Sequence, residues 1–268
     1  MLLNSLCLIQ ESGMSISAYK FDLSLPHCQW WLAITSPQIC YNREHYDYDM
    51  PGMRTSEAGL AEWAKNISES WGIETRRDWH QMIHQLAMAE VHGNVWRSEF
   101  SRRACMTNQA WLQRIDATKS EVAQGELRFV DAVFRHVGVA GFKAWDYCRA
   151  SFLTRAGYAI GKVTQEEFAF LLNYLSRQIQ RDYLSWEQYL QSFIFGRAYW
   201  EYMNDEDEDE VNIPYLLSNG FGIGYSQFFN LIDNDPDIPI PALAWDVRLP
   251  DIQVPESLNA LLNETSEG

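Results

Sequence analysis

The sequence lacks any run of about 18 consecutive apolar residues, which is the length that an α-helix needs to cross the hydrocarbon core of a membrane. The N-terminus begins with a short apolar stretch. No Lys or Arg precedes this stretch, and Asn4 and Ser5 interrupt it, so it matches a secretory signal poorly. These absences predict a soluble protein of the cytoplasm that has no membrane partner.

Cysteines are few and follow no pairing pattern. The five cysteines are an odd number at irregular spacing, and no C-x-x-C motif occurs. Disulfide frameworks and thiol-ligated metal sites depend on paired or closely spaced cysteines. We therefore expect free thiols in a reducing compartment, packed as small apolar side chains.

Basic residues are too few to balance the acidic ones. The chain has 21 Lys and Arg against 36 Asp and Glu, which gives a formal net charge of −15 at pH 7. Such a surface repels the phosphates of nucleic acids and anionic lipid head groups, so neither is an expected partner. It attracts a basic protein partner instead. The alternative explanation of the acidity is solubility alone.

The usual catalytic and cofactor motifs are also missing. There is no G-x-S-x-G, no G-x-x-x-x-G-K-[ST] and no strand-borne G-x-G-x-x-G. The Gly-rich run at 220–224 follows no predicted strand, so it is better explained as a loop. No cofactor is predicted, and no motif indicates an enzyme.

Apolar residues, by contrast, are plentiful. They make up 47% of the chain and aromatic residues 14%, which is enough for a packed core. Their spacing of three and four residues predicts helices at 56–71, 75–93, 94–115, 119–137, 140–157, 164–179 and 185–203. Capping patterns begin at Thr75, Thr164 and Ser185, and short connectors between helices favour antiparallel neighbours.

These patterns together predict a mostly α protein with one domain. We expect a bundle of about six to eight helices over residues 53–250. Residues 1–52 contain Pro26, Pro37 and Pro51 and are expected to form an irregular segment packed on the core. The Pro-rich stretch after the helices should wrap across them, and residues 251–268 form a C-terminal tail.

A charged cluster is predicted on the helix at 140–157. Asp146 and Arg149 are three residues apart, so their side chains meet on one helix face. Arg149 also falls on the apolar stripe, where an unpaired charge is costly. Arg197 lies similarly on the helix at 185–203 and would join the cluster if the two helices pack antiparallel. The cluster is either a buried ion network or an anion-binding or acid/base site, in which His92 is a further candidate.

A second candidate site is a pair of histidines. His80 and His84 are four residues apart on one helix, a spacing that can bind zinc with His92 or Glu90 as a third ligand. The H-E-x-x-H motif is absent, and two histidines at this spacing recur by chance. We therefore predict no metal. His92 alone is better explained as a charged residue at a helix C-terminus.

Six consecutive carboxylates follow the last predicted helix. They are Asp205, Glu206, Asp207, Glu208, Asp209 and Glu210. Like charges repel, so the simplest interpretation is a solvated loop. The alternatives are a cation site or a docking strip for a basic partner, and the spacing of a calcium loop is absent.

Several short motifs resemble the YbeU/YbeR-type family of bacterial proteins of unknown function. The resemblance covers about residues 60–250 and rests on the order W-D-x-x-R, S-W and G-R-x-x-W, which this chain carries at Trp145–Arg149, Ser185-Trp186 and Gly196–Trp200. Further matches are Trp71-Gly72-Ile73, His92-Gly93, Gly157-Tyr158, Thr164–Glu167, Gln178 and Pro241–Asp246. The resemblance implies a helical, intracellular protein, and it implies no reaction or cofactor.

Two functions remain open. The first is a non-enzymatic interaction protein, such as an immunity or antitoxin-like protein that binds and neutralises a basic partner. The second is an enzyme or small-anion-binding protein that uses Asp146, Arg149 and Arg197. We expect structural roles for Trp145, Trp186 and Trp200, which lie on apolar helix faces.

Overall fold

The structure is a computed structural model that describes residues 21–42, 56–204, 230, 232–234 and 240–263. Within these residues the chain is helical and contains no strand, so the mostly α fold is confirmed. The α-helices are α2 (Pro26–Ala33), α3 (Ser36–Asn42), α4 (Glu57–Trp71), α5 (Arg76–Ala87), α6 (Arg97–Ala104), α7 (Asn108–Ala117), α8 (Glu121–Val137), α9 (Lys143–Ala159), α10 (Gln165–Asp182), α11 (Trp186–Met203) and α13 (Glu256–Asn263). Two short 3₁₀ helices are η2 (Gly138–Ala140) and η4 (Ile240–Ala242).

The helices begin where the capping residues predict. Thr75 and Thr164 open α5 and α10 with complete capping boxes, and the Ser185 hydroxyl accepts a hydrogen bond from the backbone of Gln188 at the start of α11. Gly72 ends α4 with a φ of 63°, a left-handed conformation that favours glycine. No helix in the described part is long and apolar enough to cross a membrane.

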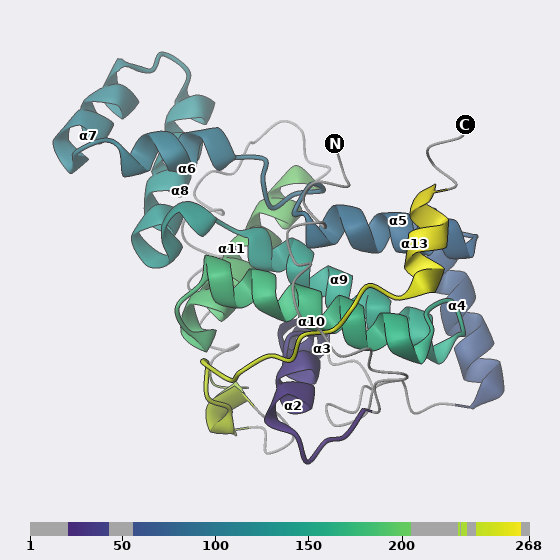
Figure 1. Ribbon diagram of the computed structural model, residues 1–268. Helices are drawn as coiled ribbons and strands as arrows, with labels where there is room; N and C mark the ends of the chain where they lie inside the picture. Colours follow the sequence, from purple (N-terminus) through teal and green to yellow (C-terminus); the bar gives the residue numbers. More distant parts are fainter. Residues whose placement is uncertain (1–20, 43–55, 205–229, 231, 235–239, 264–268) are drawn as a thin grey trace.

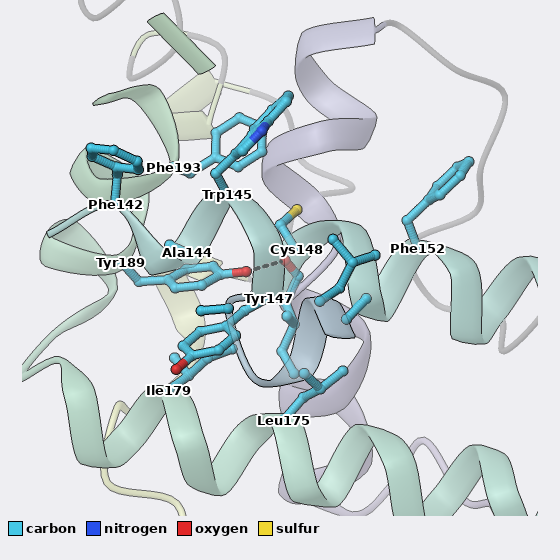
Figure 2. Packing of buried hydrophobic residues seen from close by; sticks show 14 of the residues in the cluster. Phe142, Ala144, Trp145, Tyr147, Cys148, Phe152, Leu175, Ile179, Tyr189 and Phe193 are labelled. Carbon is cyan, nitrogen blue, oxygen red and sulfur yellow. Dashed lines mark hydrogen bonds between the residues drawn. The ribbon is translucent and has the colours of Figure 1, made fainter. Parts of the chain in front are cut away.

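Helix α9 is the centre of the fold. Every residue from Ala144 to Gly157 is buried, because α5, α10, α11 and α3 pack around it. Figure 2 shows Leu175 and Ile179 of α10 on one side of α9 and Tyr189 and Phe193 of α11 on another. A helix that is buried on all sides has no solvent-exposed face on which its polar residues can lie. These residues must therefore hydrogen-bond to partners inside the protein.

The N-terminal segment differs from the expected irregular structure. Its described part forms α2 and α3, which place Trp30 and Trp31 fully inside the core. Pro26 and Pro37 stand in the first turns of these helices, where proline starts a helix and leaves no hydrogen bond unmade. The Trp30 ring packs on Trp186 and Trp245 at centroid distances of 4.5 and 5.5 Å.

The helix expected at 94–115 is two helices, α6 and α7. The helix is interrupted at Cys105–Thr107. The Thr107 hydroxyl accepts a hydrogen bond from Ala110 N and so caps the start of α7. Together with α8 these helices form a helical arm (residues 97–137), which extends to the upper left of Figure 1. Buried Arg103 holds the arm together, because its Nε donates to Asp131 Oδ1 at 2.6 Å and its guanidinium faces the rings of Trp111 and Phe134.

The Pro-rich stretch near the C-terminus wraps across the helices as expected. Its described part includes a C-terminal strap (residues 243–251), which crosses α10 in Figure 1. Gln180 Nε2 donates to the carbonyl oxygens of Trp245 and Val247 at 2.8 and 3.0 Å, and Asn173 Nδ2 donates to that of Pro250 at 2.9 Å. Side chains of α10 therefore fix the strap. The tail beyond it contains α13.

Candidate functional site

Asp146 lies in the first turn of α9 and is fully buried. Its Oδ2 accepts hydrogen bonds from the backbone N–H groups of His92 and Gly93, both at 2.8 Å. The residues that supply these donors belong to the turn-rich segment 88–96 between α5 and α6. One carboxylate thus anchors this segment to the central helix.

Arg149 lies one turn further along α9 and is only 7% exposed. Its Nη2 lies 2.5 Å from Asp146 Oδ1 and 2.9 Å from His92 Nδ1. The guanidinium carbon lies 4.8 Å from the ring centroid of Trp145 and 5.5 Å from that of Trp71. The predicted pairing of Asp146 with Arg149 is therefore present, and His92 joins it.

His92 occupies the outer side of this cluster. Burial lowers its pKa, the positive charge of Arg149 lowers it further, and Asp146 opposes the shift. A neutral ring can accept the hydrogen bond from Arg149 on Nδ1. The interpretation of His92 as a charged residue at a helix end is wrong, because α5 ends at Ala87 and the pKa shift favours the neutral form.

Gly93 is a part of the cluster that sequence reasoning did not single out as functional. A Cβ at this position would lie 2.8 Å from Ala89 Cβ, 2.8 Å from Lys143 Cα and 3.4 Å from Asp146 Oδ2. Only glycine lets the segment approach the start of α9 closely enough for its N–H to reach the carboxylate. The signal in the sequence was the His92-Gly93 pair itself.

Arg197 does not join the cluster. Its Nη2 pairs with Glu201 Oε1 at 2.8 Å within α11, whereas the contacts of Asp146 and Arg149 involve His92 and Gly93. The neighbouring Gly196 faces α9, where an added Cβ would lie 2.3 Å from Trp145 Cβ. Successive residues on a helix are turned by about 100°, so Arg197 points away from that contact. The prediction that Arg197 would join Asp146 and Arg149 is therefore wrong in its third member, since Arg149 pairs with Asp146 and Arg197 pairs with Glu201.

The two histidines of α5 lie in different surroundings. His80 Nε2 lies 3.4 Å from Glu167 Oε2, and burial lowers the pKa of His84. No group of three His, Cys, Asp or Glu that could hold a metal ion occurs in the described ranges. His80 and His84 therefore have no third metal ligand in those ranges, and His80 contacts the Glu167 carboxylate instead.

Glu167 forms a second buried cluster, which the sequence indicated only as a helix cap. Arg76 makes a two-pronged contact with its carboxylate, and Ser257 of α13 donates to Oε1 at 2.5 Å. Burial raises the pKa of Glu167, but hydrogen bonds from His80, Arg76 and Ser257 outweigh burial and hold the pKa well below its usual value of 4.5. This carboxylate joins α5, α10 and α13.

A third cluster surrounds Asp182 at the end of α10. Its Oδ2 accepts hydrogen bonds from the Tyr147 hydroxyl at 2.7 Å and from Lys143 Nζ at 3.0 Å, and Arg181 Nε lies 3.2 Å from Oδ1. Burial of the phenol and the nearby Asp182 charge raise the pKa of Tyr147. Like the other two, this cluster joins separate segments of the chain through a carboxylate whose oxygens already have partners.

The remaining candidates divide into tryptophans and the acidic strip. Trp186 Nε1 donates to Leu243 O at 3.1 Å and its ring meets Trp245 edge-on at 5.2 Å, so it holds the strap. Trp145 and Trp200 pack on each other at a centroid distance of 6.0 Å between α9 and α11. The strip from Asp205 to Glu210 lies outside the described residues.

Comparison with known proteins gives a family but no activity. The profile of a family described as "Protein of unknown function (DUF1266)" matches residues 66–245. Two similar proteins come from Escherichia coli (strain K12). Uncharacterized protein YbeU is 32% identical over 184 residues, which cover 69% of this chain and 75% of that protein. Uncharacterized protein YbeR is 28% identical over 180 residues, which cover 67% of this chain and 75% of that protein. No solved structure matches the chain. The resemblance to the YbeU/YbeR-type family is confirmed.

Proposed function

The chain belongs to the DUF1266 family of proteins of unknown function, and we propose from its surface that it is a non-enzymatic protein that binds a basic protein partner. In its most specific form, the proposal is an immunity or antitoxin-like protein that neutralises a basic partner by covering it. The observation that carries the proposal is the distribution of charge over the described surface.

Among the described residues outside the helical arm, exposed acidic side chains outnumber exposed basic ones by twelve to five. The acidic ones are Asp22, Glu57, Glu62, Glu69, Glu74, Glu90, Glu166, Glu187, Asp233, Asp246, Asp251 and Glu256. The basic ones are Lys65, Arg77, Arg177, Arg181 and Arg248. On the arm the balance is reversed, because Arg97, Arg102, Lys119, Arg128 and Arg135 are exposed against Asp116 and Glu121. The acidic excess therefore belongs to the body, by which we mean the described residues outside 97–137, and it would steer a basic partner there.

Helix α4 is the element best suited to receive such a partner. Ile67 is its one buried residue, so most of the helix faces solvent. Glu62 and Glu69 are both exposed and seven residues apart, which places them on one face. Lys65 pairs with Glu69 at 3.7 Å, but both side chains are more than half exposed and the pair can open at little cost.

The buried clusters favour binding over catalysis. Asp146 accepts three hydrogen bonds from within the chain, and Glu167 and Asp182 are equally engaged. A general base must have a lone pair that can reach a substrate. Because these carboxylates serve helix packing, the cluster at Asp146 and Arg149 supports the enzymatic alternative poorly.

The test is capture of partners from cells of the source organism by the tagged full chain, at about 20 mM and about 200 mM salt. We expect one stoichiometric basic protein that is lost at the higher salt. The variant Glu62→Lys/Glu69→Lys should lose it, whereas Glu90→Lys/Asp116→Lys, with the same change in net charge, should retain it. A third variant with Asp205–Glu210 changed to the corresponding amides tests the acidic strip.

Three outcomes would overturn the proposal. They are the absence of any partner at either salt, a partner that is not basic, or a basic partner retained by both the α4 variant and the strip variant. Growth rescue by co-expression with the identified partner then tests the neutralising form of the proposal, because a toxin's target cell should survive only when the chain is present.

A further inference from the structure

A groove of about 550 Å³ lies between α10 and the C-terminal strap. Arg177, Gln180 and Arg181 line it from α10, and Trp245, Asp246 and Arg248 are among the residues that line it from the strap. The volume falls in the range of small-molecule sites, which is about 300–1,000 Å³. The path of the strap over α10 can be followed in Figure 1.

The groove gathers the exposed basic charge of the body. Of the residues that the structure describes outside the arm, five basic ones are exposed, and Arg177, Arg181 and Arg248 are three of them. The lining includes one carboxylate, that of Asp246. In a chain with a formal net charge of −15, three exposed arginines along one groove are a local concentration of basic side chains, two of which also contact Asp251 and Asp182.

The three arginines differ in how far they are already engaged. Arg177 Nη2 donates to Pro250 O at 2.8 Å and lies 2.7 Å from Asp251 Oδ1, so it is held to the strap. Arg181 uses Nε toward Asp182 at 3.2 Å, and its side chain is 64% exposed. Arg248 is exposed and forms no ion pair with a carboxylate in the described part of the chain. Arg181 and Arg248 therefore keep donors for a ligand.

The apolar wall of the groove is fixed in place. Trp245 packs edge-on against Trp30 and Trp186 at centroid distances of 5.5 and 5.2 Å, and its carbonyl accepts the hydrogen bond from Gln180. A half-buried ring held on several sides loses little entropy when a flat group packs on it. Aromatic and guanidinium groups side by side suit a ligand that is flat at one end and anionic at the other.

We propose that this groove binds a small organic anion, with its phosphate or carboxylate group at Arg181 and Arg248 and its flat apolar ring against Trp245. The proposal is independent of the binding of a basic protein, because it uses the basic groove rather than the acidic surface. Arg177 contributes charge and keeps the strap in position.

Phenyl phosphate is the probe, because it carries both features. Inorganic phosphate lacks the ring and phenol lacks the charge. Titration of the full chain followed by ³¹P and ¹H NMR should show saturable one-to-one binding of phenyl phosphate, with weaker binding of phosphate and of phenol. Benzoate, tested in the same way, distinguishes a carboxylate ligand from a phosphate ligand.

Variants locate the site. Arg181→Gln/Arg248→Gln should lose affinity for phenyl phosphate by about tenfold or more, because it removes both charge-assisted hydrogen-bond donors to the phosphate group. Arg77→Gln removes an exposed arginine outside the groove and should bind as the wild type does. Arg248→Gln alone touches no ion pair in the described residues and keeps the test valid if the double variant fails to fold.

A ¹H–¹⁵N spectrum supplies a second readout. The indole N–H signal of Trp245, assigned with Trp245→Phe, should move during the titration. The proposal is overturned if the wild type shows no saturable binding, if Arg248→Gln binds as tightly as the wild type, or if phosphate binds as well as phenyl phosphate. Movement of the Trp145 indole signal without that of Trp245 would place the ligand at Arg149 and would also overturn it.

Discussion

At the scale of single residues, buried carboxylates join the helices of this protein. Asp146 holds the segment 88–96 to α9, Glu167 joins α5 to α10 and α13, and Asp182 joins the end of α10 to the start of α9. A buried ion pair is not by itself evidence of stability, because desolvation offsets much of the attraction. Removing only one partner of such a pair, however, is costly, because the other charge stays buried and unpaired.

Replacement of Arg149 by alanine tests this asymmetry. The variant leaves Asp146 Oδ1 buried without its cation, so we expect the free energy of unfolding to fall by about 3–5 kcal/mol. Urea unfolding followed by circular dichroism measures it. Arg248→Ala, at an exposed position, should change stability by no more than about 0.5 kcal/mol. An Arg149→Ala protein as stable as the wild type would show that the pair of Asp146 and Arg149 does not stabilise the fold.

The His92 ring makes stability depend on pH. Burial and the nearby Arg149 charge hold its pKa in the folded protein below the ordinary value of 6.5, so protonation favours the unfolded chain. Its contribution is present above pH 6.5 and is lost as pH falls through 6.5 toward the folded pKa. His92→Gln removes this contribution. Between pH 7 and pH 5.5 the free energy of unfolding of the His92→Gln variant should fall less than that of the wild type. The difference between the two falls should be at most about 1.4 kcal/mol per pH unit.

Thermal or urea unfolding at the two pH values checks the expectation. His84 and His27 also have lowered pKa values through burial, and their contributions persist in both proteins. An equal loss of stability in the variant and the wild type would mean that His92 titrates alike in the folded and unfolded chains.

At the scale of elements, the capping residues and the apolar spacing predicted most helices correctly, since both are local signals. The prolines hide α2 and α3 from a reading of the sequence, because proline breaks a helix in its interior but begins one in its first turn. The break between α6 and α7 was missed because the apolar stripe continues across it, from Phe100 to Trp111. The cluster partners of Glu167 could not be predicted, because Ser257 lies 90 residues away.

The position of the strap depends on hydrogen bonds from side chains of α10. Gln180→Ala removes the donor to the carbonyls of Trp245 and Val247, so the strap should open more often. Trypsin should then cleave after Arg248 faster than in the wild type, as measured by mass spectrometry over time. Gln178→Ala, whose amide donates to the Tyr174 hydroxyl, should leave the cleavage rate unchanged. Equal rates in all three proteins would show that other contacts fix the strap.

At the scale of the whole molecule, the excess of like charge opposes the compact state. With 36 acidic and 21 basic side chains, the folded chain repels itself more than the expanded chain does. Screening by salt should relieve this repulsion. From about 10 mM to about 200 mM NaCl we expect Tm to rise by about 2–4 °C. A fall in Tm would show that attractive pairs such as Arg103–Asp131 outweigh the repulsion.

The sequence predicted contacts within one helix more accurately than contacts between two helices. Asp146 and Arg149 were found from helical spacing alone, because both lie on α9. The position of Arg197 depended on how α11 is rotated against α9, and the contact of Gly196 with Trp145 sets that rotation. Spacing within one helix is a local property, whereas rotation between two helices is set by the packing of the whole core.

The packing of Trp30 against Trp186 and Trp245 also sets an order of events during synthesis. Helix α2 leaves the ribosome long before Trp245 has been translated, and at about 5–20 residues per second the interval is tens of seconds. Until then the indole of Trp30 lacks its edge-on neighbour from the strap. The side of the Trp30 ring that packs on Trp245 therefore stays uncovered until the strap has been made, although α10 and Trp186 are in place earlier.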